Sequence, residues 1–176
     1  YLPAIQRKFV WPRWKIERLF DSIMRGYPIG SFLFWELQSS KANDYVFYNF
    51  LKNYDQREPN NVRKTGAFLY PEIIGVLDGQ QRLSSLYLGL QGTHKARLKY
   101  HRRSSGHAYP ETRLYLNLLS LPYVRNNEEE QIVIDIDRDV DFEFRFLTKE
   151  DSDKRVRKGT EGTEEACLWF LVGDVM

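Results

Sequence analysis

The sequence lacks the features that mark secreted and membrane proteins. Its single cysteine, Cys167, cannot form an internal disulfide, whereas small secreted domains usually contain several cysteines. Its longest apolar runs, at residues 73–77 and 167–172, are far shorter than the roughly 20 residues of a membrane-spanning helix. The first residues include Gln6, Arg7 and Lys8 and contain no apolar signal-peptide core. We therefore expect a cytoplasmic protein.

A strong net charge is also missing. The 26 basic and 24 acidic side chains leave a formal charge of +2, which excludes a polycationic protein. Basic residues nevertheless cluster in one segment, and such a patch can bind the DNA backbone without sequence preference. A solvated loop is the alternative explanation. The candidate DNA-binding residues are Lys95, Arg97, Lys99, Arg102 and Arg103.

The pattern of apolar residues predicts an α/β fold. With 42% hydrophobic residues, the chain can form one domain around its own core. Helical spacing of apolar residues predicts one helix that begins after Pro12 and ends near Gly26, and another over residues 83–90. Alternating or short apolar runs predict strands at residues 31–37 (a buried one), 73–77, 114–118, 132–136 and 142–146. We expect a small mixed sheet flanked by helices.

Other segments are less regular. Residues 44–54 have a helical period, but their aromatic content leaves a strand as the alternative, and residues 164–176 suggest a last helix. Polar composition predicts mobile loops at residues 55–67, 93–112 and 149–163. His94, His101 and His107 all fall in the second loop. Because metal ligands need rigid support, we interpret them as loop residues and not as metal ligands.

The residues best suited to bind a ligand lie in one strand-to-helix turn. The first N–H groups of a helix lack intrahelical partners, and the helix dipole adds partial positive charge there, so anions bind such ends. A glycine lets a ligand approach the backbone, and an arginine fork suits two phosphate oxygens. Glutamines can donate further hydrogen bonds. The turn Asp78, Gly79, Gln80, Gln81 and Arg82 is therefore predicted to hold the phosphate of a nucleotide.

Asp78 has two possible roles in this turn. Its carboxylate would repel phosphate unless it held Mg²⁺ or positioned a water or a hydroxyl. It could instead cap the helix, as aspartate often does, and the two roles are compatible. The turn is not a Walker loop, because the glycine spacing and the Lys-Ser/Thr ending of that motif are missing.

Three motifs stand out along the chain: LPAIQRKFVW at residues 2–11, LFDSIMRGYPIGS at residues 19–31 and VLDGQQRL at residues 76–83. In their order, spacing and residues they resemble the N-terminal domain of GmrSD-type restriction proteins, the "DGQQR" domains related to ParB and sulfiredoxin. The resemblance is clear over residues 1–90 and looser beyond.

The resemblance implies a fold, an activity and a site. Members of this family are phage-defence proteins that sense or cut modified DNA, and the domain is regarded as a ParB/sulfiredoxin-like module that hydrolyses a nucleoside triphosphate and controls a nuclease. It implies catalytic roles for Asp78 and Arg82 and a Mg²⁺ ion at Asp78. Gln6 and Arg7 would face the same pocket as Gly79, Gln80, Gln81 and Arg82.

The resemblance also concerns partners. The nuclease centre of such proteins, a His-Asn-His motif, is absent here, so we expect residues 1–176 to be one domain at the N-terminal end of a longer protein. A C-terminal nuclease domain or a partner subunit, and DNA, are expected for that longer protein, and no membrane partner is expected. Two alternatives remain open: a nucleotide-gated DNA-binding switch without turnover, and an endonuclease that nicks DNA through its carboxylates.

Overall fold

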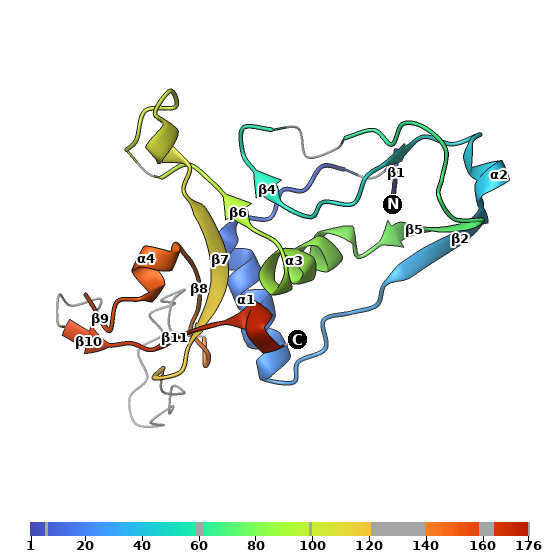
Figure 1. Cartoon of the computed structure of the whole chain (residues 1–176). Coiled ribbons are helices and arrows are strands. Elements are labelled where there is room, and N and C mark those ends of the chain that lie inside the picture. Colours follow the sequence, from blue (N-terminus) through green and yellow to red (C-terminus); the bar gives the residue numbers. More distant parts are fainter. Residues whose placement is uncertain (6, 59–61, 99, 121–139, 159–163, 176) are drawn as a thin grey trace, which may run out of the picture.

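The computed structural model describes residues 1–176 except 6, 59–61, 99, 121–139, 159–163 and 176 (Figure 1). Two helices of three turns each supply most of the helical structure, and the remaining helical segments are single turns. The helices are α1 (Arg13–Met24), α2 (Ser39–Ala42), α3 (Gln80–Leu90) and α4 (Lys149–Ser152), and the 3-10 helices are η1 (Gly106–Ala108) and η2 (Val172–Val175).

Most strands are short. They are β1 (Leu2–Pro3), β2 (Leu33–Gln38), β3 (Phe47–Tyr48), β4 (Tyr54–Asp55), β5 (Glu72–Asp78), β6 (His94–Lys95), β7 (Glu111–Asn117), β8 (Phe144–Leu147), β9 (Val156–Lys158), β10 (Glu164–Ala166) and β11 (Trp169–Leu171). β7 is the central strand of the largest sheet, in the order β11-β7-β6-β4 with β8 also paired to β7. Among the strands of the described residues, only β4 and β6 run parallel, so this sheet is mixed.

The main core lies between this sheet and the two long helices. Leu114 of β7 and Phe144 and Phe146 of β8 lie on the same face of the sheet, and α1 and α3 pack on that face. The period-2 alternation of strands and the apolar stripes of the helices explain this arrangement. The opposite face of the sheet is covered only in part, by α4. The buried residues of the core are Phe9, Ile16, Phe20, Leu88, Leu114, Phe144, Phe146 and Val172.

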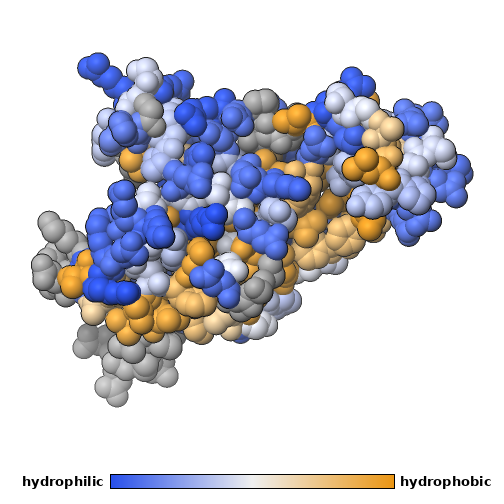
Figure 2. All heavy atoms as spheres, in the orientation of Figure 1, coloured by the Kyte–Doolittle hydropathy of each residue, from blue (hydrophilic) through white to orange (hydrophobic). Residues whose placement is uncertain are grey.

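An arm extends from this body (Figure 1). In it β2 and β5 form an antiparallel pair, and Tyr1 bonds to the other edge of β5 through Ile74 and Val76. A second core of Leu37, Ala42, Phe47 and Ile73 fills its inner side. Within the described residues β2 pairs only with β5, so its outer edge is open. Figure 2 shows apolar surface along β2, where Leu33 and Phe34 are exposed.

The structure confirms the expected mixed α/β fold, with helices on both faces of a small mixed sheet. The helices after Pro12 and over residues 83–90 are confirmed, as are strands near residues 31–37, 73–77, 114–118 and 142–146. The predicted strand at residues 132–136 lies outside the described residues. The burial predicted for the strand near residues 31–37 is wrong, because only one side of the arm is covered.

Other predictions failed where aromatic or charged residues obscured the period. The helix predicted over residues 44–54 is wrong, and the strand alternative is correct only for Phe47–Tyr48 (β3) and the start of β4, with irregular chain between them. The α-helix predicted over residues 164–176 is wrong, because the described residues 164–175 contain β10, β11 and η2. The segments 55–67 and 93–112, expected to be loops, are irregular over most of their described residues apart from the end of β4, β6, η1 and the start of β7, whereas residues 149–158 contain α4 and β9. For β3, β4, β6 and β11, pairing with a strand distant in the sequence decides the conformation, which short-range patterns do not report.

His94 is not a loop residue. It lies in β6 with 2% of its surface exposed, its ring stacks on Tyr54 with centroids 4.5 Å apart, and it also contacts Phe146. Arg13 donates from Nε to His94 Nδ1 over 3.0 Å, which leaves the ring proton on Nε2. Burial, reinforced by the Arg13 charge, lowers the pKa of His94 from 6.5 to about 3.

This depressed pKa predicts acid sensitivity. Neutral His94 is favoured in the folded state, so its contribution to stability is fully present above pH 6.5. It is lost as the pH falls from 6.5 toward 3, because the unfolded chain then binds a proton that the folded chain rejects. The free energy of unfolding should fall with a slope of up to about 1.4 kcal/mol per pH unit from this group.

Urea denaturation at several pH values checks this prediction. In His94→Gln the part of the slope that belongs to His94 should disappear. The exposed His101 is the matched control, and His101→Gln should keep the wild-type slope. An unchanged pH dependence in His94→Gln would contradict the assignment.

Candidate functional site

The predicted turn joins β5 to α3. β5 ends at Asp78, Gly79 adopts a left-handed conformation (φ 81°) as the N-cap, and α3 begins at Gln80. A Cβ at residue 79 would lie 2.6 Å from the Phe32 ring, so both the conformation and the space require glycine. The sequence therefore turns the chain sharply enough for α3 to start directly at the strand end.

The first turn of α3 has no side-chain cap. Gly79 supplies none, and the described residues place no side-chain hydrogen bond at the N-cap. Asp78 does not cap the helix; its carboxylate is 71% exposed and lies 3.8 Å from Nη2 of Arg82. Of the two roles predicted for Asp78, capping is therefore not seen. The backbone N–H groups that begin α3 keep the partial positive charge of a helix N-terminus.

Gln81 holds the N-terminal segment against this turn. Its amide Nε2 donates to the Lys8 carbonyl over 3.0 Å, and its Oε1 accepts from the Val10 N–H over 2.9 Å. The side chain is 8% exposed, so both bonds are largely shielded from water. Gln81 thereby satisfies the backbone of the first sequence motif, which lies more than 70 residues earlier.

Arg82 holds the second motif in the same way. Its guanidinium donates to the carbonyls of Ile29 and, over 2.8 Å, Ser31, and it lies over the Phe32 ring at 5.2 Å. A Cβ at Gly30 would collide with the guanidinium. The fork predicted to bind phosphate thus binds backbone carbonyls here, while its charge stays beside the start of α3.

Arg7 is one of two exposed cations, with Lys8, in the segment that Gln81 holds. Its side chain is exposed, and it has no hydrogen bond or ion pair in the part of the chain that the structure describes. Gln81 donates to the backbone carbonyl of the next residue, Lys8, so the backbone of Arg7 lies close to the start of α3. Gln6, predicted to face the same pocket, lies outside the described residues.

Two buried polar atoms on α3 also lack hydrogen-bond partners among the residues that the structure describes. Gln80 is 4% exposed and its Oε1 accepts no hydrogen bond; the hydroxyl of Ser84, one turn later on the same side of the helix, is fully buried and equally unpaired. Leaving a buried polar group unpaired costs about 1–3 kcal/mol. Sequence reasoning missed Ser84, although its spacing of four from Gln80 could have suggested a shared face.

The single carboxylate at the turn, that of Asp78, suits a metal ion that arrives bound to the phosphates of a ligand. The described residues contain no group of three or more His, Cys, Asp or Glu side chains that could hold a metal ion by themselves. Mg²⁺ in nucleotide sites is usually bound through one or two carboxylates together with phosphates and water. The exposed Asp78 at the start of α3 fits that mode of binding.

The described residues of the predicted basic cluster lie in different surroundings in the structure. Lys95 is in β6 and pairs with Glu111 over 2.9 Å, and the backbone N–H of Arg97 is held by Gln56. Arg102 and Arg103 are exposed on the loop before η1. Lys99 lies outside the described residues. Figure 1 shows this loop projecting away from the junction of β5 and α3, so the cluster does not extend the turn.

Comparisons with known proteins agree with the motifs. Residues 1–166 match the family model described as GmrSD restriction endonuclease, N-terminal domain. Over 90 residues the chain is 38% identical to the uncharacterized protein MJ0686 of Methanocaldococcus jannaschii. That match covers 51% of this chain and 14% of the relative. In the described residues no helix combines the length and apolar character needed to cross a membrane.

The contacts of Gln81 predict a structural role that can be measured. Gln81→Leu leaves the Lys8 carbonyl and the Val10 N–H without partners, which should lower the free energy of unfolding by about 1–3 kcal/mol. Urea denaturation measures the change. Gln91, an exposed residue at the end of the same helix, is the control, and Gln91→Leu should stay within about 0.5 kcal/mol of wild type. Equal stability of the two variants would contradict this role.

Proposed function

Because the chain belongs to the family of GmrSD restriction endonuclease N-terminal domains, we propose that it is the nucleotide-binding domain of a phage-defence restriction protein. Its ligand is a nucleoside triphosphate with Mg²⁺, and the site is the start of α3. The chain covers 14% of the relative it matches, so the nuclease and the DNA contacts of the whole protein belong to this proposal too.

One observation carries the proposal. Two neighbouring side chains, Gln81 and Arg82, hold both other motifs around the start of α3 through backbone contacts. The first turn of α3 has no side-chain cap, the carboxylate of Asp78 is exposed beside it, and the exposed cation Arg7 precedes the residue whose carbonyl Gln81 holds. Amides and a cation attract phosphate oxygens, and a carboxylate beside them binds the accompanying metal ion.

Each residue then has a distinct role. The N–H groups of the first turn and Arg7 bind phosphate oxygens, and Asp78 binds Mg²⁺ or orients the attacking water. Arg82 keeps its two carbonyl partners and contributes its positive charge at a fixed position, which stabilises charge that develops on the phosphates. Hydrolysis here relies on positioning and charge stabilisation.

Binding without turnover is the second candidate. Asp78 is the one carboxylate that the described residues place at this turn, and phosphoryl transfer also needs a group that orients the nucleophile. If Asp78 is occupied with Mg²⁺, no second carboxylate is at hand for that task. The domain would then act as a switch whose occupied state licenses a nuclease elsewhere.

Calorimetric titration with a non-hydrolysable triphosphate tests the site. Arg7→Ala should weaken binding at least tenfold, with or without Mg²⁺, because it removes a direct phosphate contact. Asp78→Asn should weaken binding in Mg²⁺ but not in EDTA, where loss of the carboxylate removes repulsion. Arg82 is left intact, because its replacement would also release residues 29–31.

The matched control is Lys8→Ala, which removes the neighbouring exposed cation and keeps the carbonyl that Gln81 holds. Its affinity should stay within twofold of wild type. The proposal fails if the wild-type chain binds no triphosphate, or if all three variants bind it equally well.

Turnover separates the candidates. Phosphate release that disappears in Asp78→Asn indicates a hydrolase, and binding without release indicates the switch. Supercoiled plasmid incubated with the purified chain and Mg²⁺ or Mn²⁺ should remain intact. Nicking by the wild-type chain would favour the DNA-nicking alternative instead.

A further inference from the structure

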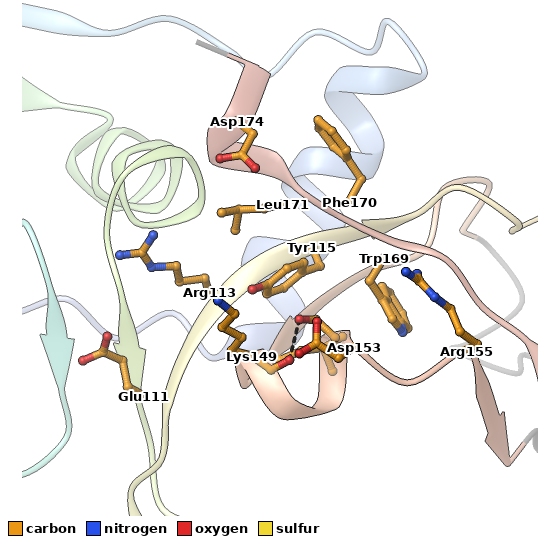
Figure 3. Close-up of a pocket in the computed structure, with 12 residues that line it drawn as sticks. Glu111, Arg113, Tyr115, Lys149, Asp153, Arg155, Trp169, Phe170, Leu171 and Asp174 are labelled. Carbon is orange, nitrogen blue, oxygen red and sulfur yellow. Dashed lines mark hydrogen bonds between the residues drawn. The ribbon is translucent and has the colours of Figure 1, made fainter.

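A hollow of about 570 Å³ opens on the face of the main sheet opposite α1 and α3 (Figure 3). It is enclosed by β7, the end of β8, α4, β11 and η2, and none of its lining residues belongs to the turn at residues 78–82. Its volume lies in the range of small-molecule sites. The hollow is therefore a separate place where a ligand could bind.

The alternation of β7 explains its lining. Leu114 points into the core, so its neighbours Arg113 and Tyr115 point to the opposite face. Leu147 lies beside Arg113 in β8, and Leu171 lies beside Tyr115 in β11. A sheet face turned to water normally carries polar residues. Here it carries rings and aliphatic side chains, with Trp169 half-buried among them.

Three cations rim these apolar groups. Arg113, Lys149 and Arg155 are exposed and have no hydrogen-bonded or ionic side-chain partner in the described part of the chain. Figure 3 shows Arg113 and Lys149 on one side of Tyr115, with Trp169 and Arg155 on the other. One end of the hollow thus offers two positive charges, and the other offers an indole ring beside a guanidinium.

The acidic residues limit which anions fit. Glu111 is neutralised by Lys95, whereas Asp153 and Asp174 are exposed carboxylates. Three free cations against two carboxylates leave a small positive excess, which suits one phosphate group and opposes a long polyphosphate. Carboxylates also accept hydrogen bonds from the amino and hydroxyl groups that accompany phosphate in nucleotides.

We propose that the hollow binds a nucleotide unit carrying a single phosphate, with the phosphate at Arg113 and Lys149 and the base stacked on Trp169. Bases stack on aromatic rings and on arginine planes, with about 1–3 kcal/mol per base from the ring. A free nucleoside monophosphate and an unstacked nucleotide of single-stranded DNA share this chemistry. The site is independent of the triphosphate site proposed at α3.

Two titrations of the whole chain distinguish these sources. One follows the anisotropy of a fluorescent ten-nucleotide single-stranded DNA, and the other measures binding of nucleoside monophosphates by calorimetry. Binding of the DNA alone assigns the site to a strand, and binding of the monophosphate alone assigns it to a free nucleotide. If neither binds at millimolar concentration, the proposal is overturned.

Variants connect binding to the hollow. Arg113→Gln combined with Lys149→Gln should weaken binding at least tenfold and lower its salt dependence, because phosphate contacts release counterions. Trp169→Leu should weaken binding at least tenfold without changing that salt dependence. Both cations are exposed, so the double variant tests the proposal even if Trp169→Leu does not fold.

Lys154→Gln is the matched control. Lys154 lies between Asp153 and Arg155 but pairs with Asp151 over 2.5 Å and does not line the hollow. It should keep its affinity within twofold of wild type. Arg7→Ala and Asp78→Asn should also bind as wild type, which separates this site from the turn. Unchanged affinity in the Arg113 and Lys149 double variant would overturn the proposal.

Discussion

The pair of side chains that begins α3 organises the rest of the structure. Gln81 and Arg82 are neighbours, yet one holds the backbone of residues 8–10 and the other that of residues 29–31. Both side chains donate hydrogen bonds to backbone carbonyl groups that would otherwise need water as their partner. Three segments far apart in the sequence are therefore fixed around one helix end, with Gly79 providing the only backbone shape that brings β5 and α3 so close. The site and the scaffold depend on the same five residues.

The regular helices could be predicted from the sequence, whereas the contacts between distant segments could not, for physical reasons. Regular apolar spacing in residues 13–24 and 83–90 reports local structure, so those helices were found. The bonds of Gln81 and Arg82 join residues more than 50 positions apart, which no local pattern records, so both were predicted to face a ligand. His94 was placed in a loop because its environment comes from Arg13, Tyr54 and Phe146, each from another segment.

β7 connects the two places where ligands are proposed. Leu114 packs on the side that supports α1 and α3, and Arg113 and Tyr115 face the hollow on the other side. The same short strand therefore supports the helix that carries the turn and forms the floor of the hollow. Arg113 and Asp174 also line a smaller space of about 230 Å³ beside the end of α3. The two sites are thus joined through one strand and one helix, without sharing a residue.

The arm has a consequence for how this domain is handled. The outer edge of β2 offers a row of backbone groups free to pair, next to the exposed Leu33 and Phe34. Such edges join with one another when chains are concentrated, unless charges interrupt them. Glu36 is the one acidic residue in β2, and a single charge opposes that association only weakly. Storage in dilute solution at low ionic strength, which leaves the charge of Glu36 unscreened, or a charged residue at position 34, would keep the isolated chains apart.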